Sequence, residues 1–316
     1  MQVEKKDHDQ PPLVSVVIPT HNRAGLVTRA IASVLEQTFA DLECIVVDDA
    51  SADGTEAAVS GIGDTRLRYV KNAVNAGAPA SRNRGIREAR GRYVALLDDD
   101  DAWLPKKLEK QLRFFDSAPE RVGLIYSGFH YASGESGEII STFQPAYRGA
   151  VYPDLLKGCI LGSPTPLIKK TCFELAGGFD ESLPGCQDWD MWLRIAKVCD
   201  FDFISEPLAK HYVHGRQISA DLDAKIAARS QLFEKHYEDI RKQPRLMYAH
   251  LKSLAILYFL KGESSHGRLL LLQGIRTYPP QITGYIHLLL SLLPPLHRRV
   301  LLKTNVVRVD DITFYY

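Results

Sequence analysis

The chain has 316 residues, of which 45% are hydrophobic and 24% charged. This composition allows one large core or two smaller ones, and it excludes a disordered or fibrous chain. The formal net charge of +1 excludes a global positive field of the kind that nucleic-acid-binding proteins use. The five cysteines are odd in number and lack the spacing of metal ligands, which favours a reducing cytoplasm.

The amino-terminal residues 1–12 are polar and lack the apolar segment of a secretory signal. We therefore expect a flexible start and a chain on the cytoplasmic side. The next hundred residues alternate β-branched runs with helical patterns, as in a parallel sheet covered by helices. The expected strands are 13–18, 42–47, 67–70 and 93–97. We expect Pro19 to end the first strand, and Asn75 to cap a helix that runs to about Arg90.

The fourth expected strand is fully apolar and ends in four aspartates, Asp98 to Asp101. In open α/β sheets, ligands bind at the carboxyl ends of the strands, so the polar loops after the first, second and fourth strands should converge. Adjacent carboxylates repel one another unless a cation lies among them, and their hard oxygens suit magnesium or manganese. The alternative is a solvated turn or a helix cap.

The pattern changes twice after the acidic run. Between residues 122 and 204 it is mixed, with strand-like runs at 122–126 and 201–204 and a helix at about 188–198, and this half should hold the acceptor side. Beyond residue 214 it is almost wholly helical, with helices expected near 221–240, 245–260, 264–278 and 282–293. The last of these is too short to span a bilayer and is closed by Pro294 and Pro295, so no membrane-spanning segment is expected.

Six segments in order, VSVVIPTHNR, VVDDASADGT, ASRNRGI, GRYVALLDDDD, GGFDE and QDWDMWLR, resemble those of family 2 inverting glycosyltransferases with the GT-A fold. The resemblance spans residues 13–214. It implies an α/β nucleotide-diphospho-sugar transferase fold with a mainly parallel central sheet flanked by helices and a C-terminal helical extension. The implied domains are a catalytic domain at 13–215, with a nucleotide-sugar half at 13–105 and an acceptor half at 106–215, and a helical region at 216–316.

The resemblance also implies roles on the donor side. It places Pro19, Thr20, Arg23 and Asp49 at the nucleotide base, where Asp49 would accept a hydrogen bond from the ring. One of Asp48 and Asp49 is expected to cap the following turn instead, because adjacent side chains point apart. Arg82 would pair with phosphate or base oxygens.

Within the acidic run, the family pattern D-x-D maps onto Asp98, toward the ribose, and Asp100, on a Mn²⁺ or Mg²⁺ ion. Asp99 can substitute in either role, because the extra Asp101 leaves two ways to place the pattern. The family often has a histidine near the metal or the diphosphate at the position of His214. Two histidines three residues apart, His211 and His214, are by themselves a weak metal signal.

For the transfer step, an acceptor hydroxyl needs a base to take its proton. The resemblance puts Asp188 in that role, although Gln187 stands where the family has a second acidic residue. Asp190 is the second choice. Trp189 is assigned to the acceptor side, where its ring would face a sugar; the other apolar residues of this helix have core spacing.

Together these features imply a metal-dependent inverting hexosyltransferase that moves a sugar from a nucleoside diphosphate, with UDP as the expected carrier. The acceptor would be a hydroxyl of a glycan or a polyprenyl-linked glycan in cell-surface polysaccharide or glycoconjugate synthesis. The alternatives are a sugar-phosphate nucleotidyltransferase and a catalytically silent nucleotide-sugar-binding module. Nucleic acid is not an expected partner.

The C-terminal helices allow two interpretations. The first is a structural cover for the catalytic domain. The second is peripheral contact with the inner face of the membrane, because leucines 288–290, 292 and 293 precede a basic group, His297, Arg298, Arg299 and Lys303.

Overall fold

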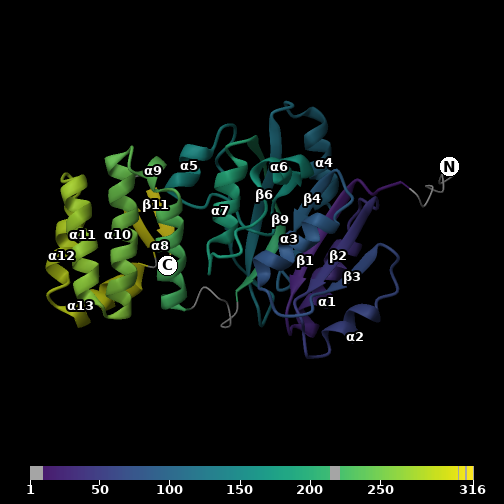
Figure 1. The fold of residues 1–316 in the computed structure, drawn as a ribbon, viewed down its shortest axis with the longest axis horizontal. Coiled ribbons are helices and arrows are strands. Elements are labelled where there is room, and N and C mark those ends of the chain that lie inside the picture. Colours follow the sequence, from purple (N-terminus) through teal and green to yellow (C-terminus); the bar gives the residue numbers. More distant parts are fainter. Residues whose placement is uncertain (1–9, 214–220, 305, 310–311, 316) are drawn as a thin grey trace. The chain divides into compact units, whose positions relative to one another are not determined.

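The computed structural model describes residues 10–213, 221–304, 306–309 and 312–315, which form two units (Figure 1). The first unit comprises Met1–Val151, Ile160–Glu181 and Arg194–His214. The second comprises Tyr152–Cys159, Ser182–Leu193 and Gly215–Tyr316.

A mixed sheet forms the centre of the first unit. Its strands are β1 (Val14–Thr20), β2 (Leu42–Asp48), β3 (Leu67–Lys71), β4 (Tyr93–Leu96), β5 (Ala102–Trp103), β6 (Val122–Ser133), β7 (Ile139–Phe143), β8 (Leu167–Lys169) and β9 (Asp200–Val213). Their order is β3-β2-β1-β4-β8-β6-β9-β5, with β7 paired to β6. The first four strands are parallel, as are β6 and β9, whereas β8 pairs antiparallel with both β4 and β6. Every residue of β1 and β2 is buried, which explains why both strands are mostly apolar.

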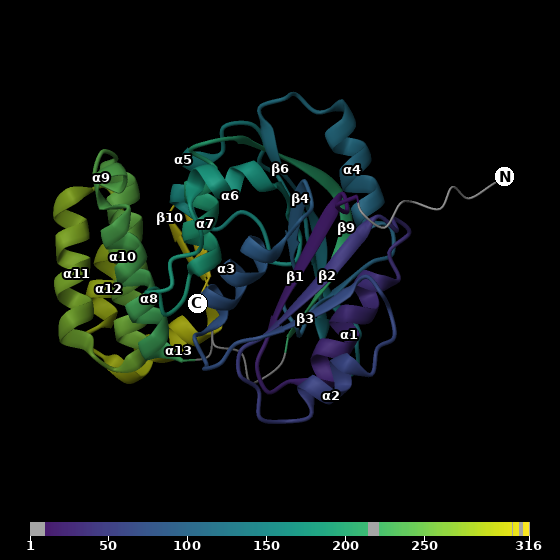
Figure 2. The ribbon, with the colours of Figure 1, turned by 45° about the vertical axis from the view of Figure 1, so that its right-hand side comes forward.

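Helices cover both faces of this sheet (Figure 2). They are α1 (Ala24–Leu35), α2 (Thr55–Ser60), α3 (Ala78–Glu88), α4 (Lys107–Ser117) and α6 (Lys170–Ala176). The chain steps from β1 to β2 to β3 in one direction and then back across the sheet to β4. Because such crossovers are right-handed, α1 and α2 lie on one face and α3 on the other. The predicted α/β architecture is therefore confirmed, and the first four predicted strands agree with the observed ones to within two residues at each end.

Two local predictions are wrong. Pro19 does not end β1, which continues to Thr20. On the side of β1 that faces β4, the last hydrogen bond runs from Leu97 N to Val17 O. Pro19 lies two residues later and faces the same side, beyond the end of the β1–β4 pairing. The N–H that proline lacks therefore removes no hydrogen bond between strands. Asn75 does not cap α3: the N-cap is Gly77, with a φ of 88°, and the Gly77 N–H is bound by Asp49.

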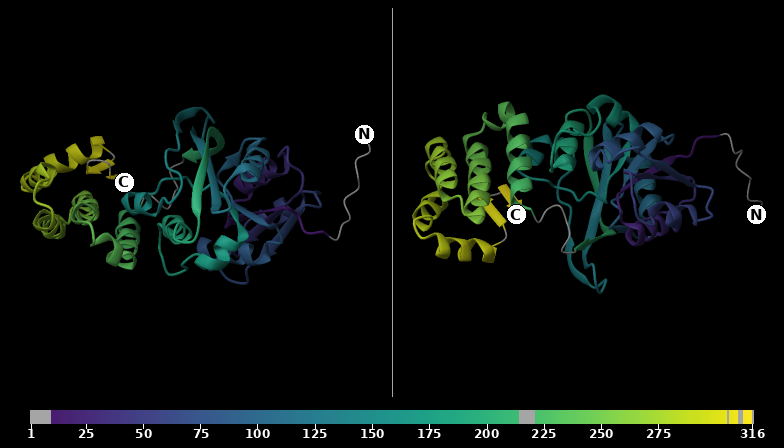
Figure 3. Two further views of the ribbon diagram at one scale, coloured as in Figure 1. Left: turned by 90° about the horizontal axis from the view of Figure 1, so that it is seen from above. Right: turned by 60° about the horizontal axis from the view of Figure 1, so that its bottom comes forward.

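The second unit is mainly helical. It contains α5 (Tyr152–Lys157), α7 (Gln187–Ile195) as far as Leu193, α8 (Leu222–Lys235), α9 (Tyr237–Ile240), α10 (Pro244–Lys261), α11 (Ser264–Thr277), α12 (Ile282–Leu290), α13 (Pro294–Thr304), and the hairpin β10 (Val306–Val309) and β11 (Ile312–Tyr315). Helix α10 is buried along almost its whole length, and α8 and α11 pack against it (Figure 3). Pro294 and Pro295, expected to close the helix at 282–293, follow the end of α12 at Leu290 and also begin α13, because proline suits the first turn of a helix. None of the described helices is long and apolar enough to cross a membrane.

One buried carboxylate joins the amino ends of the parallel strands. Glu43 in β2 is 2% exposed and accepts from Ser15 Oγ at 2.7 Å, from Arg90 N at 2.8 Å and from Arg68 at 2.9 Å. Burial by itself would raise the pKa of Glu43, but these donors hold it below its ordinary value. The charged form of Glu43 therefore stabilises the fold.

We expect Glu43→Gln to lower the free energy of unfolding by about 2 kcal/mol at pH 7, because it weakens bonds to a charged, buried acceptor. The folded-state pKa is lowered, so this contribution is fully present above about pH 4.5 and is lost as the pH falls through the lowered value. Denaturant unfolding of wild type and variant from pH 7 to pH 3 measures the difference. The control is Glu56→Gln, which removes an exposed pair with Lys71 and should change the free energy of unfolding much less than Glu43→Gln does, because solvent screens exposed pairs. Equal losses in both variants, or a Glu43 deficit that does not shrink in acid, would contradict the assignment.

Candidate donor-binding site at the carboxyl ends of β1, β2 and β4

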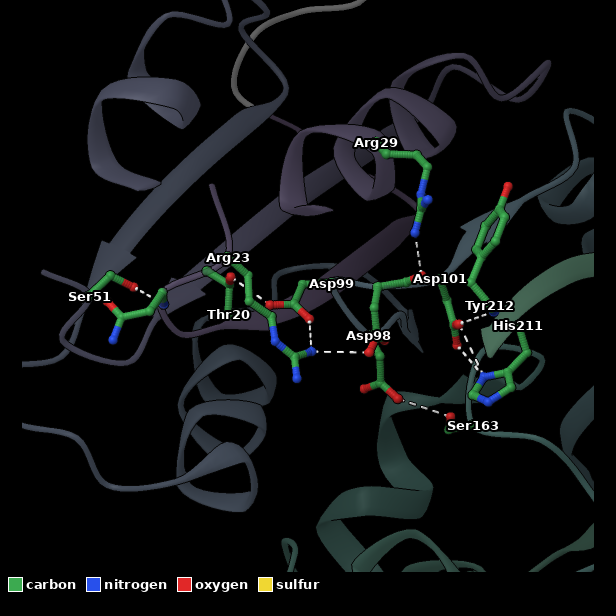
Figure 4. Close-up of polar contacts among 12 residues, drawn as sticks. Thr20, Arg23, Arg29, Ser51, Asp98, Asp99, Asp101, Ser163, His211 and Tyr212 are labelled. Carbon is green, nitrogen blue, oxygen red and sulfur yellow. Dashed lines mark hydrogen bonds and ion pairs between the residues drawn. The ribbon is translucent and has the colours of Figure 1, made fainter. Parts of the chain in front are cut away.

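The loops that follow β1, β2 and β4 meet at one edge of the sheet (Figure 4). Asn22 N donates to Ser51 Oγ at 2.8 Å, and Ala52 N donates to Asn22 Oδ1 at 2.8 Å, which joins the first two loops. Asn22 and Ala50 have φ values of 52° and 58°. Left-handed backbone is costly for alanine in particular and persists where the surroundings enforce it, which occurs most often at functional sites.

The first two aspartates of the acidic run bind groups from different parts of the unit. Asp98 accepts from Arg82 in α3 at 2.5 Å and from Ser163 Oγ at 3.0 Å. Asp99 accepts from Thr20 Oγ1 at the end of β1, at 2.7 Å, and from Arg23 at 2.8 Å. The strand end is thereby connected to α3 and to the first loop.

The other two aspartates are bound as well. Arg23 also donates to Asp100 Oδ2, at 3.0 Å, and Arg29 donates to the main-chain oxygen of Asp100 at 2.6 Å. Asp101 is fully buried and accepts from Tyr212 N, with His211 Nδ1 also 3.1 Å from its carboxylate. Asp101 therefore joins the acidic run to the end of β9.

The electrostatic state differs along the run. Burial would raise the pKa of Asp98, but the Arg82 guanidinium and the Ser163 hydroxyl hold that pKa below its ordinary value. Burial raises the pKa of Asp99 despite Thr20 and Arg23, and it raises the pKa of Asp101 to about 6 despite His211. The carboxyls of the run therefore differ in how readily each takes up a proton.

The two aspartates after β2 bind the protein itself. Asp48 accepts from Ser51 N at 2.8 Å and from the hydroxyl of Tyr69. Asp49 accepts from Asn72 Nδ2 at 2.7 Å and from the main-chain nitrogens of Ala76 and Gly77. Burial would raise the pKa of Asp49, but these donors lower it. Asp49 N also donates to Thr20 O at 2.8 Å, so Asp49 lies beside the end of β1 and fixes the segment that leads into α3.

The segment GGFDE, which the sequence marks without a physical reason, has one in the structure. Asn83 of α3 accepts a hydrogen bond at Oδ1 from Phe179 N, at 2.6 Å, and donates from Nδ2 to Phe179 O and to Glu181. A Cβ on Gly178 would lie 2.5 Å from Asn83 Oδ1, so only glycine allows this approach. The Phe179 ring in turn lies under the Arg82 guanidinium, 5.6 Å from its centroid. The segment therefore positions Arg82.

The structure brings together most of the donor-side residues predicted from the sequence: Pro19, Thr20, Arg23, Asp49, Arg82, Asp98, Asp99 and Asp100. The sequence analysis missed three others that contact the acidic run, Arg29, Ser163 and Tyr212. Arg29 and Tyr212 stack on one another at 3.8 Å. Neither residue belongs to a motif, and no local pattern would have identified them.

The acceptor-side predictions fall in the second unit. Asp188 lies half-buried in the first turn of α7, where its carboxylate accepts from Trp189 N at 2.8 Å. Trp189 is 3% exposed, donates from Nε1 to Leu155 O, and has Arg229 over its ring. Asp190 is fully buried between Lys235 and His236, each 3.0 Å away.

The predicted open ring face is thus absent at Trp189 in this conformation, because core contacts occupy it. Asp190 is thus fully buried, whereas Asp188 is half-buried. His214 lies outside the described residues.

A hollow of about 490 Å³ lies at the opposite edge of the same sheet. Its lining includes Leu13, Asp41, Arg92 and Lys170, which precede or begin β1, β2, β4 and α6. Ligands of open α/β sheets bind at the carboxyl ends of the strands, so the edge with the acidic run is the candidate ligand site.

Comparison with known proteins supports a specific family. The family model described as glycosyl transferase family 2 matches residues 15–146. Over 185 residues, the chain is 32% identical to the UDP-Glc:alpha-D-GlcNAc-diphosphoundecaprenol beta-1,3-glucosyltransferase WfgD of Escherichia coli, covering 58% of this chain and 70% of that one. It is 34% identical over 214 residues to the putative teichuronic acid biosynthesis glycosyltransferase TuaG of Bacillus subtilis, covering 66% and 82%.

Solved structures show the same fold. The structure of S. aureus TarS 1-349 in complex with UDP-GlcNAc superposes with a TM-score of 0.63 at 16% identity, covering 96% of both chains. The mannosyltransferase PcManGT from Pyrobaculum calidifontis, in complex with GDP-Man and Mn²⁺, gives a TM-score of 0.55 at 19% identity, covering 93% of this chain and 88% of that one. Both likenesses confirm the predicted GT-A fold with C-terminal helices.

We expect Asn83→Ala to lower the free energy of unfolding by about 2–3 kcal/mol, because it leaves the buried Phe179 main chain without partners. The same change should weaken binding of UDP, since Arg82 loses the ring that positions it. Denaturant unfolding and calorimetry measure the two effects. Arg87→Ala, an exposed change on the same helix, is the control. The positioning role is refuted if the two variants bind UDP with the affinity of the wild type.

Proposed function

The chain belongs to glycosyl transferase family 2, and from this premise we propose that it transfers a sugar from a UDP-sugar to a hydroxyl of a glycan or lipid-linked acceptor, with inversion of the anomeric centre. One observation carries the donor side of the proposal: Thr20, Arg23, Arg82 and the acidic run form a connected polar cluster at the carboxyl edge of the sheet. The printed names of TarS with UDP-GlcNAc and of WfgD support UDP as the carrier.

We assign the donor-side roles as follows. Pro19, Thr20, Arg23 and Asp49 surround the base, because they end β1 and β2 side by side. Asp98 faces the ribose, with Asp99 beside it. Arg23 and Arg82 are bound to carboxylates here, and their guanidinium groups have the fork geometry that also suits phosphate oxygens. Each can therefore exchange a carboxylate for a phosphate when the donor binds.

We propose a Mn²⁺ or Mg²⁺ ion at Asp100, with His214 as a further ligand. Among the described residues there is no group of three or more side chains placed to hold a metal ion. The residues nonetheless fit such an ion, because these cations are often held by one or two carboxylates together with substrate phosphates. When bound, the ion offsets the negative charge of the leaving diphosphate. The complex of PcManGT with Mn²⁺ supports this choice.

Asp188 is the proposed base. As the acceptor oxygen forms its bond to the anomeric carbon, Asp188 takes the hydroxyl proton, and the bond from that carbon to the nucleoside diphosphate breaks. A single displacement of this kind inverts the anomeric centre. Asp188 suits the role better than Asp190 because it is half-buried, whereas Asp190 is fully buried.

The wider setting is also part of the proposal. We retain a catalytic domain at 13–215 and a helical region at 216–316 that approaches the inner face of the membrane from the cytoplasm. The printed acceptor of WfgD and the printed pathway of TuaG support an acceptor from lipid-linked or cell-surface glycan synthesis. A nucleotidyltransferase or a catalytically silent module gains no support from the family match.

A panel of nucleotide sugars, titrated with and without Mn²⁺, tests the donor proposal. We expect UDP-sugars to bind wild type and to bind about tenfold or more tightly with the ion, and Asp100→Ala to abolish that gain while keeping ion-independent binding. Asp116→Ala, an exposed change in α4, serves as the matched control. Preference for another nucleotide would overturn the choice of UDP, and an undiminished Mn²⁺ effect in Asp100→Ala would remove Asp100 from the metal site.

Asp188→Asn should bind the donor within about twofold of wild type but lose about 10²–10⁴-fold in turnover, because it removes the base and keeps the shape. Calorimetry gives the first quantity, and release of nucleoside diphosphate with acceptor gives the second. Asp116→Asn carries the same chemical change at an exposed site and should leave both unchanged. Turnover that survives in Asp188→Asn would show that another group takes the proton.

A further inference from the structure

Exposed apolar side chains are concentrated in one part of the second unit. In the described part of the chain, nineteen large hydrophobic side chains are exposed, and eleven of them lie between Leu269 and Leu302. The α12 surface comprises Ile282, Tyr285, Ile286, Leu289, Leu292 and Leu293, whose exposed fractions lie between 43% and 72%. Contiguous exposed apolar surface of this kind marks a binding face.

Helix α12 exposes the face that a helix of a water-soluble domain normally buries. Ile282, Tyr285, Ile286 and Leu289 have the i, i+3, i+4, i+7 spacing that normally faces a core, yet these side chains point to solvent. The inward face carries Gly284, and a Cβ there would lie 2.7 Å from Tyr248 Oη and 3.0 Å from Ile275. The fold itself therefore enforces the exposure, because α12 can approach α10 and α11 closely only on its glycine side.

The charge of the same region has one sign. Residues 264–309 include six arginines and lysines and no aspartate or glutamate. Arg298 and Arg299 are exposed on α13, the helix that follows the α12 surface (Figure 1). His297, which the sequence groups with them, is instead buried, with its ring nitrogen 3.0 Å from that of His287. The basic group on this face is thus made of arginines.

Apolar side chains beside exposed arginines complement a partner that has an apolar interior covered by a negatively charged surface. The interface of an anionic bilayer has this structure: acyl chains lie beneath acidic headgroups. A second copy of this chain would also bury the leucines. Because this region has no carboxylates, however, pairing it with itself would bring arginine toward arginine. The charge pattern therefore favours lipid.

We infer that α12 and the start of α13 dock this chain on an anionic membrane surface, with the α12 surface inserted at the acyl boundary and Arg298 and Arg299 at the headgroups. The helices lie on the bilayer, since no described helix has the length and apolarity to cross it. The inference rests on the proposed function in one respect, because a lipid-linked acceptor gives such docking its purpose. It identifies the residues and the lipid charge involved.

Flotation of the full chain with vesicles tests the inference. We expect binding to vesicles of phosphatidylcholine with phosphatidylglycerol at least tenfold tighter than to phosphatidylcholine alone. Ile286→Glu with Leu289→Glu should reduce binding to the anionic vesicles at least tenfold. Arg298→Gln with Arg299→Gln should reduce it by a similar factor at low salt and by less at high salt.

The matched control is Ile140→Glu with Leu175→Glu, which places the same charges on exposed apolar residues of the first unit. It should bind vesicles like wild type, and its thermal unfolding shows the cost of the charges themselves. If this control and Ile286→Glu with Leu289→Glu lost vesicle binding equally, the inference would be overturned. Failure of the wild type to float would overturn it as well. Sedimentation velocity addresses the other occupant: an oligomer that Ile286→Glu with Leu289→Glu dissociates, together with no vesicle binding, would assign the surface to a second copy.

Donor binding, measured on the same proteins without vesicles, separates the two proposals. If wild type floats but binds no nucleotide sugar, the proposed function fails and the membrane inference stands. If it binds a nucleotide sugar but does not float, the membrane inference fails alone. The Ile286→Glu with Leu289→Glu variant should keep the donor affinity of the wild type, since neither residue belongs to the donor site.

Discussion

Four carboxylates in a row at the end of a buried strand repel one another, and much of the first unit serves to offset that repulsion. At about 4 Å, two unit charges interact by roughly 4 kcal/mol near a protein surface, so several such pairs would unfold a strand end that had no counter-charges. Arg23 and Arg82 supply these from different segments, the loop after β1 and helix α3. His211 of β9 also contacts the run and adds a positive charge when it is protonated. The acidic run can therefore lie at this strand end only because these elements converge on it.

The same cluster would suit the proposed ligand, an anion that carries a cation. In the proposed function, the arginines that neutralise aspartates would turn to the diphosphate, and a divalent ion would take their place among the carboxylates. Asp101 stands apart, because it is buried and bound to the main chain of Tyr212. It joins the run that follows β4 to the end of β9, a strand that pairs with β6 and β5.

The sequence predicts the first half of the fold well, because the signals there are local: apolar strands that end in polar loops, and carboxyl ends that must share an edge. It cannot predict which donor meets which aspartate, since Asp98 and Ser163 are 65 residues apart and Asp101 and His211 are 110 apart. It also misassigns side chains whose role depends on packing. Trp189 is held in a core by Leu155 and Arg229, and α12 has a core-like spacing that the structure turns outward because glycine is needed inside. Pro19 and Pro294 show a related limit, because whether proline ends or begins an element depends on where its missing N–H would point.

The position of β9 in the chain has a consequence for synthesis. Strands β1 to β4 and every group that binds Glu43 lie within the first 96 residues, so the parallel half can pair while the rest of the polypeptide is still emerging from the ribosome. The partners of Asp101 are made more than a hundred residues later. A nascent or truncated chain that stops before β9 would contain every donor-side motif and yet leave this buried carboxylate without the contacts that β9 supplies. The site is thus encoded early and completed late.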